Sequence, residues 1–268
     1  TRWLFVTGVQ TCALPILVEV EEVVYEYTPA DNGAGPMWCH GSTCLVRLGD
    51  ALFASGLETI PEEKPLNNCR WTFWRRGSEG WTLLQKDPAG RTREPCPLAA
   101  FPEPGLVFLS ANPTLNPPGQ AGGGPARPVL FEFTAADASG PPKSHWPAWE
   151  SKLAPPAFTE HSYRSLAADG PARELILFQN IGYTHAEWAF RDRDGNWSAQ
   201  GRLTWPWGAE YDTPQPIRVC YPNVALRARA VHFVGVSDII EPDAKWRQAK
   251  REITGREWDY DFRRLFYA

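Results

Sequence analysis

The sequence predicts an all-β protein built as a β-propeller, and three observations support this fold class. The 26 Pro and 22 Gly residues together make 48 of 268 positions, well above the roughly 12% of average usage, which favours many turns over long helices. Apolar residues alternate with a period of two, as at Leu106 and Phe108 or Val231 and Phe233, and this period indicates strands. A hairpin-like pattern also recurs along the chain.

The recurring unit is an apolar run, a turn and a second apolar run, which we interpret as a β-hairpin. It occurs four times, at Cys44 to Gly56, Pro97 to Asn112, Ser165 to Asn180 and Asn223 to Gly235. The starts of these copies lie 53, 68 and 58 residues apart, a spacing suited to four-stranded propeller blades. The regular spacing favours a propeller over the alternative, a β-sandwich or irregular all-β domain.

A second repeated unit lies between these hairpins. Trp71 to Trp81 and Trp188 to Trp197 each give an aromatic strand, a Gly-containing polar turn and a Trp that opens the next strand, and a third copy begins at Trp258. Two Pro-rich stretches, residues 112–128 and 140–156, are expected to be loops on either side of an outer strand at Val129 to Thr134. The best helix candidate is Asp243 to Arg256, ending near Gly255.

The first sixteen residues are treated separately. Val6 to Ile16 reads VTGVQTCALPI, which looks like a translated sequencing adapter, so residues 1–16 are excluded from fold reasoning. We expect residues 17–268 to form a single, incomplete propeller domain. About four blades are visible, and the expected whole is a five- to seven-bladed ring truncated at both ends.

Charge and composition exclude several classes of function. The formal net charge is −4 and no Lys/Arg-dense run is present, which argues against a nucleic-acid partner. No stretch approaches about 18 consecutive apolar residues, so no membrane span is expected. The cysteines form no CxxC pair and have no His at zinc-ligand spacing, so no metal and no cofactor are expected. Cys39 and Cys44 are interpreted as buried small hydrophobes, with a disulfide as the alternative. The cysteines therefore do not decide whether the protein resides in an oxidising compartment.

One blade carries a resemblance to a known family. His161 to Pro206 has a polar strand start, an apolar inner strand, a His near its end, and an aromatic strand with a DG turn. In this order of features it resembles the BNR or Asp-box-like propeller proteins, particularly the group with polysaccharide lyases that act on uronic-acid polymers, and more distantly the sialidases. The turn Asp192 to Trp197 (DRDGNW) keeps only a degenerate Asp-box. We interpret it as a hairpin turn, with a calcium loop as the less favoured alternative.

Residues that precede the innermost strands of a propeller face its central channel, and these define the candidate binding site. Arginine forks bind carboxylates bidentately, so three arginines at such positions predict a clamp for an anionic sugar. They are Arg93, Arg164 and Arg218. His40 and Tyr221 lie at equivalent positions, and Asn180 and Tyr183 are further candidates for substrate binding.

The leading prediction is β-elimination of a uronic-acid-containing polysaccharide or oligosaccharide. His161 titrates near neutral pH and suits a base, while Tyr163 lies two residues on, on the same strand face. His185 is the candidate for a second acid or base.

Two alternatives remain open. In sialidase-like or other glycoside hydrolysis, Tyr221 would act with Glu94 or Glu160. In a non-catalytic platform that binds carbohydrate or protein, loop tryptophans would stack on sugar rings; the candidates are Trp146, Trp149, Trp205 and Trp207. No phosphate loop, GxSxG elbow or HExxH is present, which argues against nucleotide-driven, serine-hydrolase and zincin chemistry.

Overall fold

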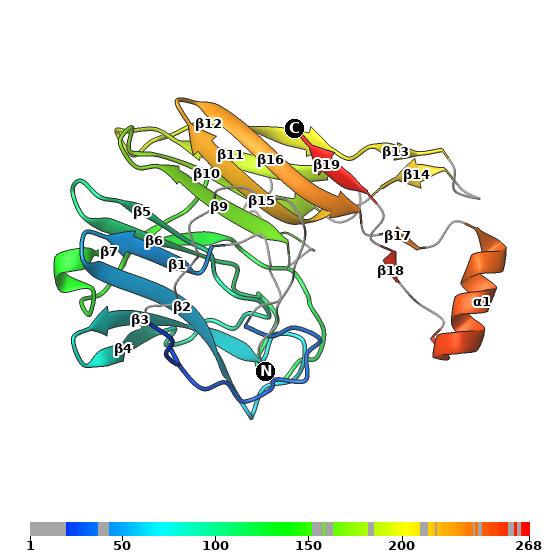
Figure 1. Ribbon diagram of the computed structural model, residues 1–268, viewed down its shortest axis with the longest axis horizontal. Helices are drawn as coiled ribbons and strands as arrows, with labels where there is room; N and C mark the ends of the chain where they lie inside the picture. Colours follow the sequence, from blue (N-terminus) through cyan, green and yellow to red (C-terminus); the bar gives the residue numbers. More distant parts are fainter. Residues whose placement is uncertain are drawn as a thin grey trace, which may run out of the picture.

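The computed structural model confirms the predicted fold class. Its main strands form four antiparallel sheets arranged as the blades of a β-propeller (Figure 1). The residues that the structure describes are 20–36, 43–151, 158, 163–181, 185–209, 214–217, 219–237, 239–240, 243–256, 260–261 and 264–268.

Blades 1 to 3 each contain four strands that follow one another in sequence order from the innermost strand outward. Blade 1 is β1 (Leu45–Leu48), β2 (Ala51–Thr59), β3 (Cys69–Gly77) and β4 (Gly80–Lys86). Blade 2 is β5 (Leu98–Phe101), β6 (Leu106–Ala111), β7 (Val129–Thr134) and β8 (Lys143–His145), with the short helix η1 (Ala135–Asp137) before β8. Blade 3 is β9 (Arg164–Asp169), β10 (Glu174–Ile181), β11 (His185–Arg191) and β12 (Trp197–Thr204).

Blade 4 has three described strands. They are β15 (Val219–Arg227), β16 (Ala230–Ser237) and β19 (Leu265–Tyr267). β19 pairs only with Val234, Gly235 and Val236 of β16, whereas β7 and β11 pair along almost the whole of β6 and β10. The third strand of blade 4 is therefore short.

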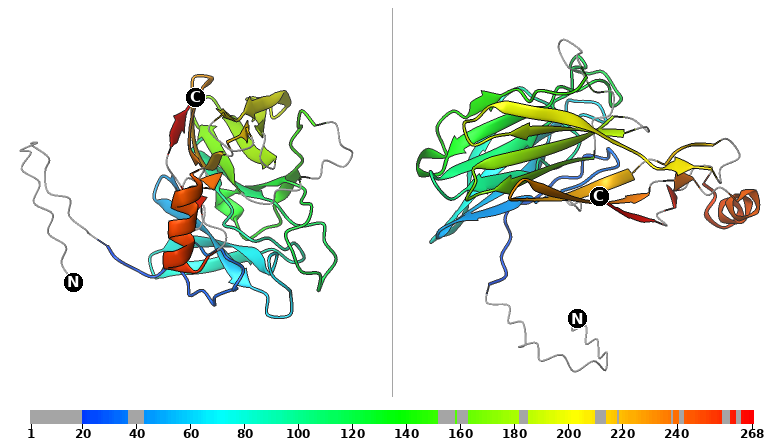
Figure 2. Two further views of the ribbon diagram at one scale, coloured as in Figure 1. Left: turned by 90° about the vertical axis from the view of Figure 1, so that its right-hand side faces the viewer. Right: turned by 90° about the horizontal axis from the view of Figure 1, so that it is seen from above.

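The innermost strands of the four blades line one channel. β1 contacts β5, β5 contacts β9, and β9 contacts β15. A cavity of about 360 Å³ is lined by all four strands, with Val46, Ala99, Ala167 and Ala225 among its walls. Three of these four side chains are alanines, and Leu98, Leu166 and Leu226 also line the cavity. Figure 2 shows the blades in two further views.

The predicted hairpins are confirmed. The four copies of the first repeat become the hairpins β1–β2, β5–β6, β9–β10 and β15–β16, and the two complete copies of the second repeat become β3–β4 and β11–β12. The strand β7 has the predicted bounds, but the prediction of a loop over residues 140–156 was wrong in part, because β8 lies within it and forms the outermost strand of blade 2. Trp258 lies outside the described residues, and β18 and β19 are the described parts of that segment.

The DG sequence of blade 3 forms a hairpin turn, as predicted. The Asp192 carboxylate oxygen Oδ1 accepts hydrogen bonds from the backbone N–H groups of Asp194 at 3.0 Å and Asn196 at 2.9 Å. Gly195 has a φ of +87°, a left-handed conformation that glycine adopts without a steric penalty. This carboxylate is thus used to close the turn.

The smaller elements extend from blades 3 and 4. They are the two-stranded ribbons β13 (Trp207–Gly208) with β14 (Gln215–Pro216) and β17 (Ile239–Ile240) with β18 (Tyr260–Asp261), and the helix α1 (Ala244–Thr254). The predicted helix is confirmed with both ends. Asp243 caps the first turn by accepting from the N–H groups of Lys245 and Trp246, and Gly255 ends the helix at a φ of +68°. No helix in the described part of the chain is long and apolar enough to cross a membrane.

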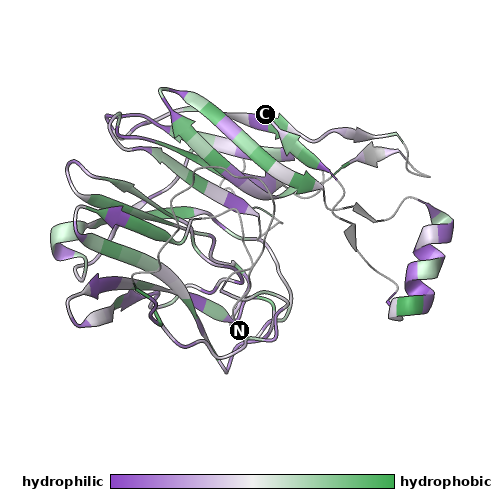
Figure 3. Ribbon diagram, in the orientation of Figure 1, coloured by the Kyte–Doolittle hydropathy of each residue, from purple (hydrophilic) through white to green (hydrophobic). Residues whose placement is uncertain are grey.

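Three of the four hydrophobic clusters among the described residues lie between blades, and the fourth packs Ala30 on Leu57 and Cys69 of blade 1. Phe53 and Phe73 of blade 1 pack with Phe133 of blade 2, the last two rings being stacked 4.3 Å apart. A second cluster joins blades 2 and 3, and a third joins blades 3 and 4. In Figure 3 hydrophobic residues alternate with hydrophilic ones along the strands. Each blade therefore buries one face against each neighbouring blade. This burial explains why apolar residues recur at every second position of the strands.

Candidate functional site

The starts of neighbouring innermost strands meet at one end of the propeller. The N–H of Leu98, at the start of β5, donates to the carbonyl of Thr43 before β1 at 2.6 Å. The Arg164 guanidinium, at the start of β9, reaches the carbonyl of Pro95 at 2.9 Å. The Asn180 amide, which lies opposite Tyr163 before β9, donates to the carbonyl of Val219, the first residue of β15. We call this end of the channel the mouth.

Two tyrosines from different blades meet at the mouth. Tyr163 precedes β9 of blade 3 and Tyr221 lies in β15 of blade 4, and their rings contact edge to face with centroids 5.1 Å apart. Tyr163 has a φ of +55° and Tyr221 a φ of +51°, a region that few residues other than glycine occupy. Strained backbone of this kind is concentrated at functional sites. The pair therefore marks the mouth as the candidate site.

A buried carboxylate of blade 2 adjoins this pair. Glu94 is fully enclosed, and its Oε2 accepts the backbone N–H of Tyr163 at 3.3 Å. Tyr163 is 9% exposed, while Tyr221 is part-exposed. Side chains of blades 2, 3 and 4 thus converge within one small region beside the channel.

Arg164 occupies a different position from the one expected of a ligand clamp. It is 2% exposed, and its guanidinium donates to the carbonyl oxygens of Ser110, Glu94 and Pro95 and to the Cys96 sulfur, at distances between 2.9 and 3.3 Å. All four partners belong to blade 2. In this structure Arg164 therefore ties blade 3 to blade 2, because its donors are directed at backbone carbonyls inside the protein.

Asn180 is likewise enclosed and links two blades. It is fully buried, and its Nδ2 donates to the carbonyl of Val219 at 2.8 Å. An equivalent bond joins blades 1 and 2, where the Ser55 hydroxyl donates to the carbonyl of Cys96 at 2.5 Å. In both cases a side chain of the second strand binds the start of the next blade, so Asn180 acts here as an inter-blade tie.

A related contact was missed by sequence reasoning. The Asn112 amide of blade 2 donates to Gln179 Oε1 of blade 3 at 3.3 Å, and both side chains are buried. Asn112 and Asn180 each end a copy of the aligned hairpin repeat. That shared position was the signal that could have identified these residues as a repeated structural feature.

Arg93 is partly buried and holds a neighbouring segment. Its Nε donates to the carbonyl of Asn32 at 3.0 Å, and its Nη2 lies close to Gly33. The segment around Asn32 is thereby attached to the start of β5, next to Glu94 in sequence. Arg93 is thus placed at the mouth end and is engaged with the segment around Asn32.

His185 lies at the same end of blade 3 but further from the channel. It begins β11, which is separated from β9 by β10. Its Nε2 is 3.8 Å from Oε1 of the fully buried Glu187, and Glu187 also accepts the N–H of Ser151 at 3.0 Å. The structure therefore groups His185 with Glu187.

The remaining predicted site residues fall outside the described residues. These are His40, Glu160, His161, Tyr183 and Arg218. Their neighbours in sequence, Tyr163 and Val219, are described and lie at the mouth. The roles assigned to the five residues stay predictions.

One buried cysteine beside the mouth, Cys96, is unreactive in character. Cys96 is completely buried, and this burial raises the pKa of its thiol to about 11, although the Arg164 guanidinium acts in the opposite direction. The thiol is therefore protonated at neutral pH, and the thiolate is the form that attacks substrates and ligates metals. Cys96 serves as an apolar wall and as an acceptor for Arg164.

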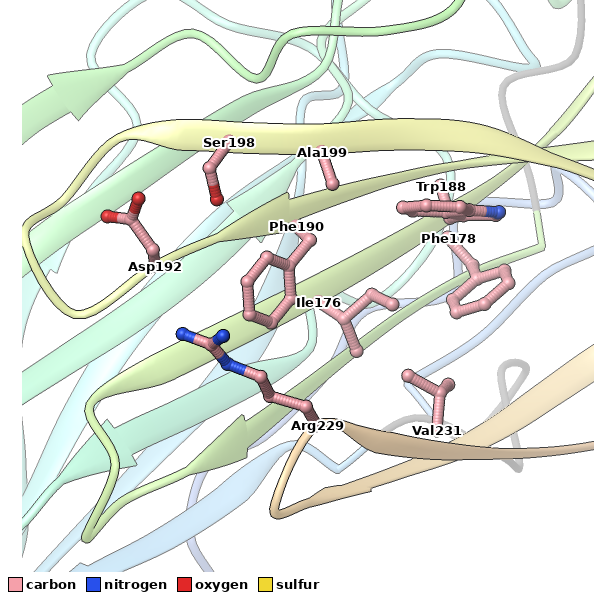
Figure 4. A pocket seen from close by; sticks show the side chains of 9 residues that line it. All are labelled: Ile176, Phe178, Trp188, Phe190, Asp192, Ser198, Ala199, Arg229 and Val231. Atoms are coloured by element: carbon pink, nitrogen blue, oxygen red, sulfur yellow. The ribbon is translucent and has the colours of Figure 1, made fainter.

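A second concavity, which the sequence did not indicate, lies between blades 3 and 4 (Figure 4). Its volume is about 630 Å³. Its walls include the apolar side chains of Phe178, Trp188 and Val231, and Figure 4 shows Asp192 and Arg229 at the opposite end. Such a groove suits an apolar group with a polar end. We call it the inter-blade groove.

Comparisons with known proteins assign neither a family nor a function to the residues described above. The chain matches no protein-family model, and no match was found among curated proteins.

Proposed function

We propose that the protein acts on an anionic, uronic-acid-containing polysaccharide or oligosaccharide bound at the mouth, and that the reaction is β-elimination. The observation that carries this proposal is the convergence of Tyr163, Tyr221 and Glu94 from three blades at the end of the central channel. The resemblance of one blade to lyase-type propellers supports the same substrate class.

The chemistry requires three kinds of group. A cation or amide donor neutralises the uronate carboxylate, a base removes the proton on the adjacent carbon, and an acid protonates the departing glycosidic oxygen as the carbon–oxygen bond breaks and a carbon–carbon double bond forms. In the proposal Arg93 and Arg218 bind the carboxylate. His161 is the base, and the Tyr163 hydroxyl supplies the proton.

Arg164 and Asn180 receive positioning roles in this scheme. Arg164 binds the carbonyl of Glu94, and Glu94 accepts the N–H of Tyr163. Asn180 holds blade 4, which carries Tyr221, against blade 3 through its bond to the carbonyl of Val219. Both residues would fix the relative positions of the reacting groups without touching the sugar.

The second candidate is glycoside hydrolysis. It is favoured by one specific observation, the placement of a buried carboxylate, Glu94, beside a tyrosine pair. In this scheme Tyr221 would be the nucleophile, assisted by Glu94, as the resemblance to sialidases implies.

A non-catalytic platform is the third candidate. The four tryptophans predicted to stack on sugar rings differ in their exposure. Trp149 and Trp205 are buried in the cores between blades, so they are not stacking surfaces for a ligand. Trp146 and Trp207 are 50% and 62% exposed, and the Arg127 guanidinium lies 4.0 Å from the centroid of the Trp146 ring. Trp207 is the better candidate for a sugar platform.

The experiment is a screen of the purified chain against uronic-acid polysaccharides, with ultraviolet absorbance and reducing ends recorded together. Elimination yields a conjugated, unsaturated uronate, so both signals should rise in proportion. Reducing ends without ultraviolet absorbance would replace elimination by hydrolysis. Binding without either signal would leave the platform, and absence of binding to every uronate polymer would reject the substrate class.

A further inference from the structure

The helix α1 stands apart from the blades. In Figures 1 and 2 it lies at one end of the molecule, beyond β15 and β16, and none of its residues is buried. Helices of folded proteins usually bury an apolar stripe against a neighbouring element. In α1 such a stripe is present but exposed, so the helix offers a surface that the described part of the chain does not use.

Trp246, Ala249 and Ile253 form this stripe, because residues three and four positions apart lie on the same side of a helix. Trp246 is 63% exposed and Ile253 is 83% exposed. Lysines border the stripe on both sides. Lys250 lies four positions after Trp246 and three before Ile253, and Lys245 lies four positions before Ala249. We call these five residues the α1 face.

The opposite side of α1 is polar. Arg247, Gln248, Arg251 and Glu252 line a concavity of about 760 Å³, and the Gln248 amide donates to Glu252 Oε1 at 2.9 Å. Apolar and polar residues are thus separated on two sides of the helix, and the exposed apolar residues lie on the α1 face.

The charge of α1 is opposite to that of the chain as a whole. Four basic side chains and one acidic side chain, Glu252, give the helix a net charge of +3, whereas the whole chain carries −4. The nearest acids outside the helix are Asp243 and Glu257, and the Asp243 carboxylate is used to cap the first turn. The helix is therefore a local positive charge on an acidic protein, complementary to an anionic partner.

We propose that the α1 face binds the surface of an anionic lipid membrane. A basic helix with Trp and an aliphatic residue on one side inserts that side at the boundary between headgroups and acyl chains. Tryptophan suits this depth, because its ring is apolar and its N–H is polar. The long aliphatic stems of Lys245 and Lys250 allow their ammonium groups to reach the lipid phosphates from the borders of the stripe.

The helix lies in the plane of the membrane in this proposal and does not cross it. Its 11 residues are about 16 Å long at 1.5 Å per residue, roughly half of the hydrocarbon thickness of a bilayer. A membrane is favoured over a protein groove because cations border the stripe on both sides. A continuous anionic surface meets both borders at once, whereas a groove would need acids on both of its rims.

The α1 face shares no residue with the mouth or with the inter-blade groove. The membrane proposal is therefore independent of the proposed β-elimination, and vesicle binding can be measured without any turnover. A failure of one proposal leaves the other intact.

The test is co-sedimentation of the full chain with lipid vesicles. The chain should bind vesicles of phosphatidylcholine and phosphatidylserine in equal amounts, and at least about tenfold more weakly to phosphatidylcholine alone, where the lysines lack anionic headgroups. Lys245→Glu with Lys250→Glu should lower binding to the anionic vesicles at least about tenfold. The matched control is Lys64→Glu with Lys143→Glu, which changes the net charge equally at exposed lysines of blades 1 and 2 and should leave binding within about threefold of wild type.

A second measurement reports insertion of the stripe and uses a mild substitution. Brominated acyl chains quench tryptophan fluorescence at short range, so brominated lipid in the anionic vesicles should quench the wild-type chain more than Trp246→Phe, which keeps an aromatic ring on the helix. Trp146→Phe is the matched control, because Trp146 is 50% exposed directly after β8 of blade 2. It should be quenched at least as much as wild type.

Four results would overturn the proposal. They are equal binding to the two kinds of vesicle, binding to neither, unchanged binding of the variant with both Lys245→Glu and Lys250→Glu, and equal quenching of wild type and Trp246→Phe. Binding to neither kind of vesicle would leave an acidic protein as the occupant of the α1 face.

Discussion

Replacing Arg164 tests whether this arginine holds the blades together or clamps a ligand. In Arg164→Met the side chain keeps most of its length and volume but loses every donor. The carbonyl oxygens of Ser110, Glu94 and Pro95 then lose a charged donor inside the protein. The expected result is a large loss of stability, because buried carbonyls without a partner remain desolvated.

The magnitude follows from the contacts. Each buried acceptor left without its donor costs about 1–3 kcal/mol, and removal of one member of a buried charged network costs about 3–5 kcal/mol. Since the contacts are at 2.9–3.3 Å and only one is short, we expect a loss of about 3–5 kcal/mol in the free energy of unfolding. This is a large part of the roughly 5–15 kcal/mol typical of a folded domain.

The assay is urea unfolding followed by circular dichroism, with two further variants. Arg47→Met is the control, because the Arg47 side chain is 70% exposed and its loss should change stability by no more than about 0.5 kcal/mol. Arg164→Lys keeps the charge but lacks the planar fork, so its stability should lie between those of wild type and Arg164→Met. If Arg164→Met is within about 1 kcal/mol of wild type while uronate binding is lost, the inter-blade role is refuted.

Further predictions concern other ties and groups. Asn180→Ala should lower the free energy of unfolding by about 1–3 kcal/mol through the loss of the bond to Val219, measured by the same assay; an unchanged value would contradict the tie. Cys96 should resist alkylation at pH 8 in the native protein and react after unfolding, because its raised pKa of about 11 keeps the thiol protonated; peptide mass spectrometry reports the modified site. The hydrogen bond from His145 and the charge of Arg191 lower the pKa of Glu132, so its contribution to stability is present at neutral pH and is lost as the pH falls below 4.5 through the lowered value. Acid unfolding of Glu132→Gln should accordingly show a weaker dependence on pH in that range.

The strand pattern could be predicted because burial between blades imposes a period of two on every hairpin. Val129 to Thr134 was predicted as a strand with the bounds that the structure gives it, since Pro-rich segments delimit it on both sides. The helix was predicted through its caps, Asp243 and Gly255. These features depend on local sequence, which is why they were accessible without the fold.

The roles of individual polar residues could not be predicted in the same way. An arginine that precedes an innermost strand can point into the channel or toward the previous blade, and the sequence is the same in both cases. Arg164 points toward blade 2 because carbonyls at the start of β5 lie within its reach. Asn180 was likewise interpreted as a binding residue, because the sequence does not show whether its side chain points toward the channel or toward the next blade.

The central claim is that the mouth carries out chemistry on a uronate sugar, and Tyr163→Phe tests it most directly. The variant removes one hydroxyl and retains the ring that contacts Tyr221. Turnover of a uronate oligosaccharide should fall by about 10²–10⁴-fold, the usual contribution of a general acid or base. The dissociation constant of the sugar should change less than about threefold, which is well below the tenfold change that 1.4 kcal/mol would produce. Turnover at the wild-type rate would contradict the claim.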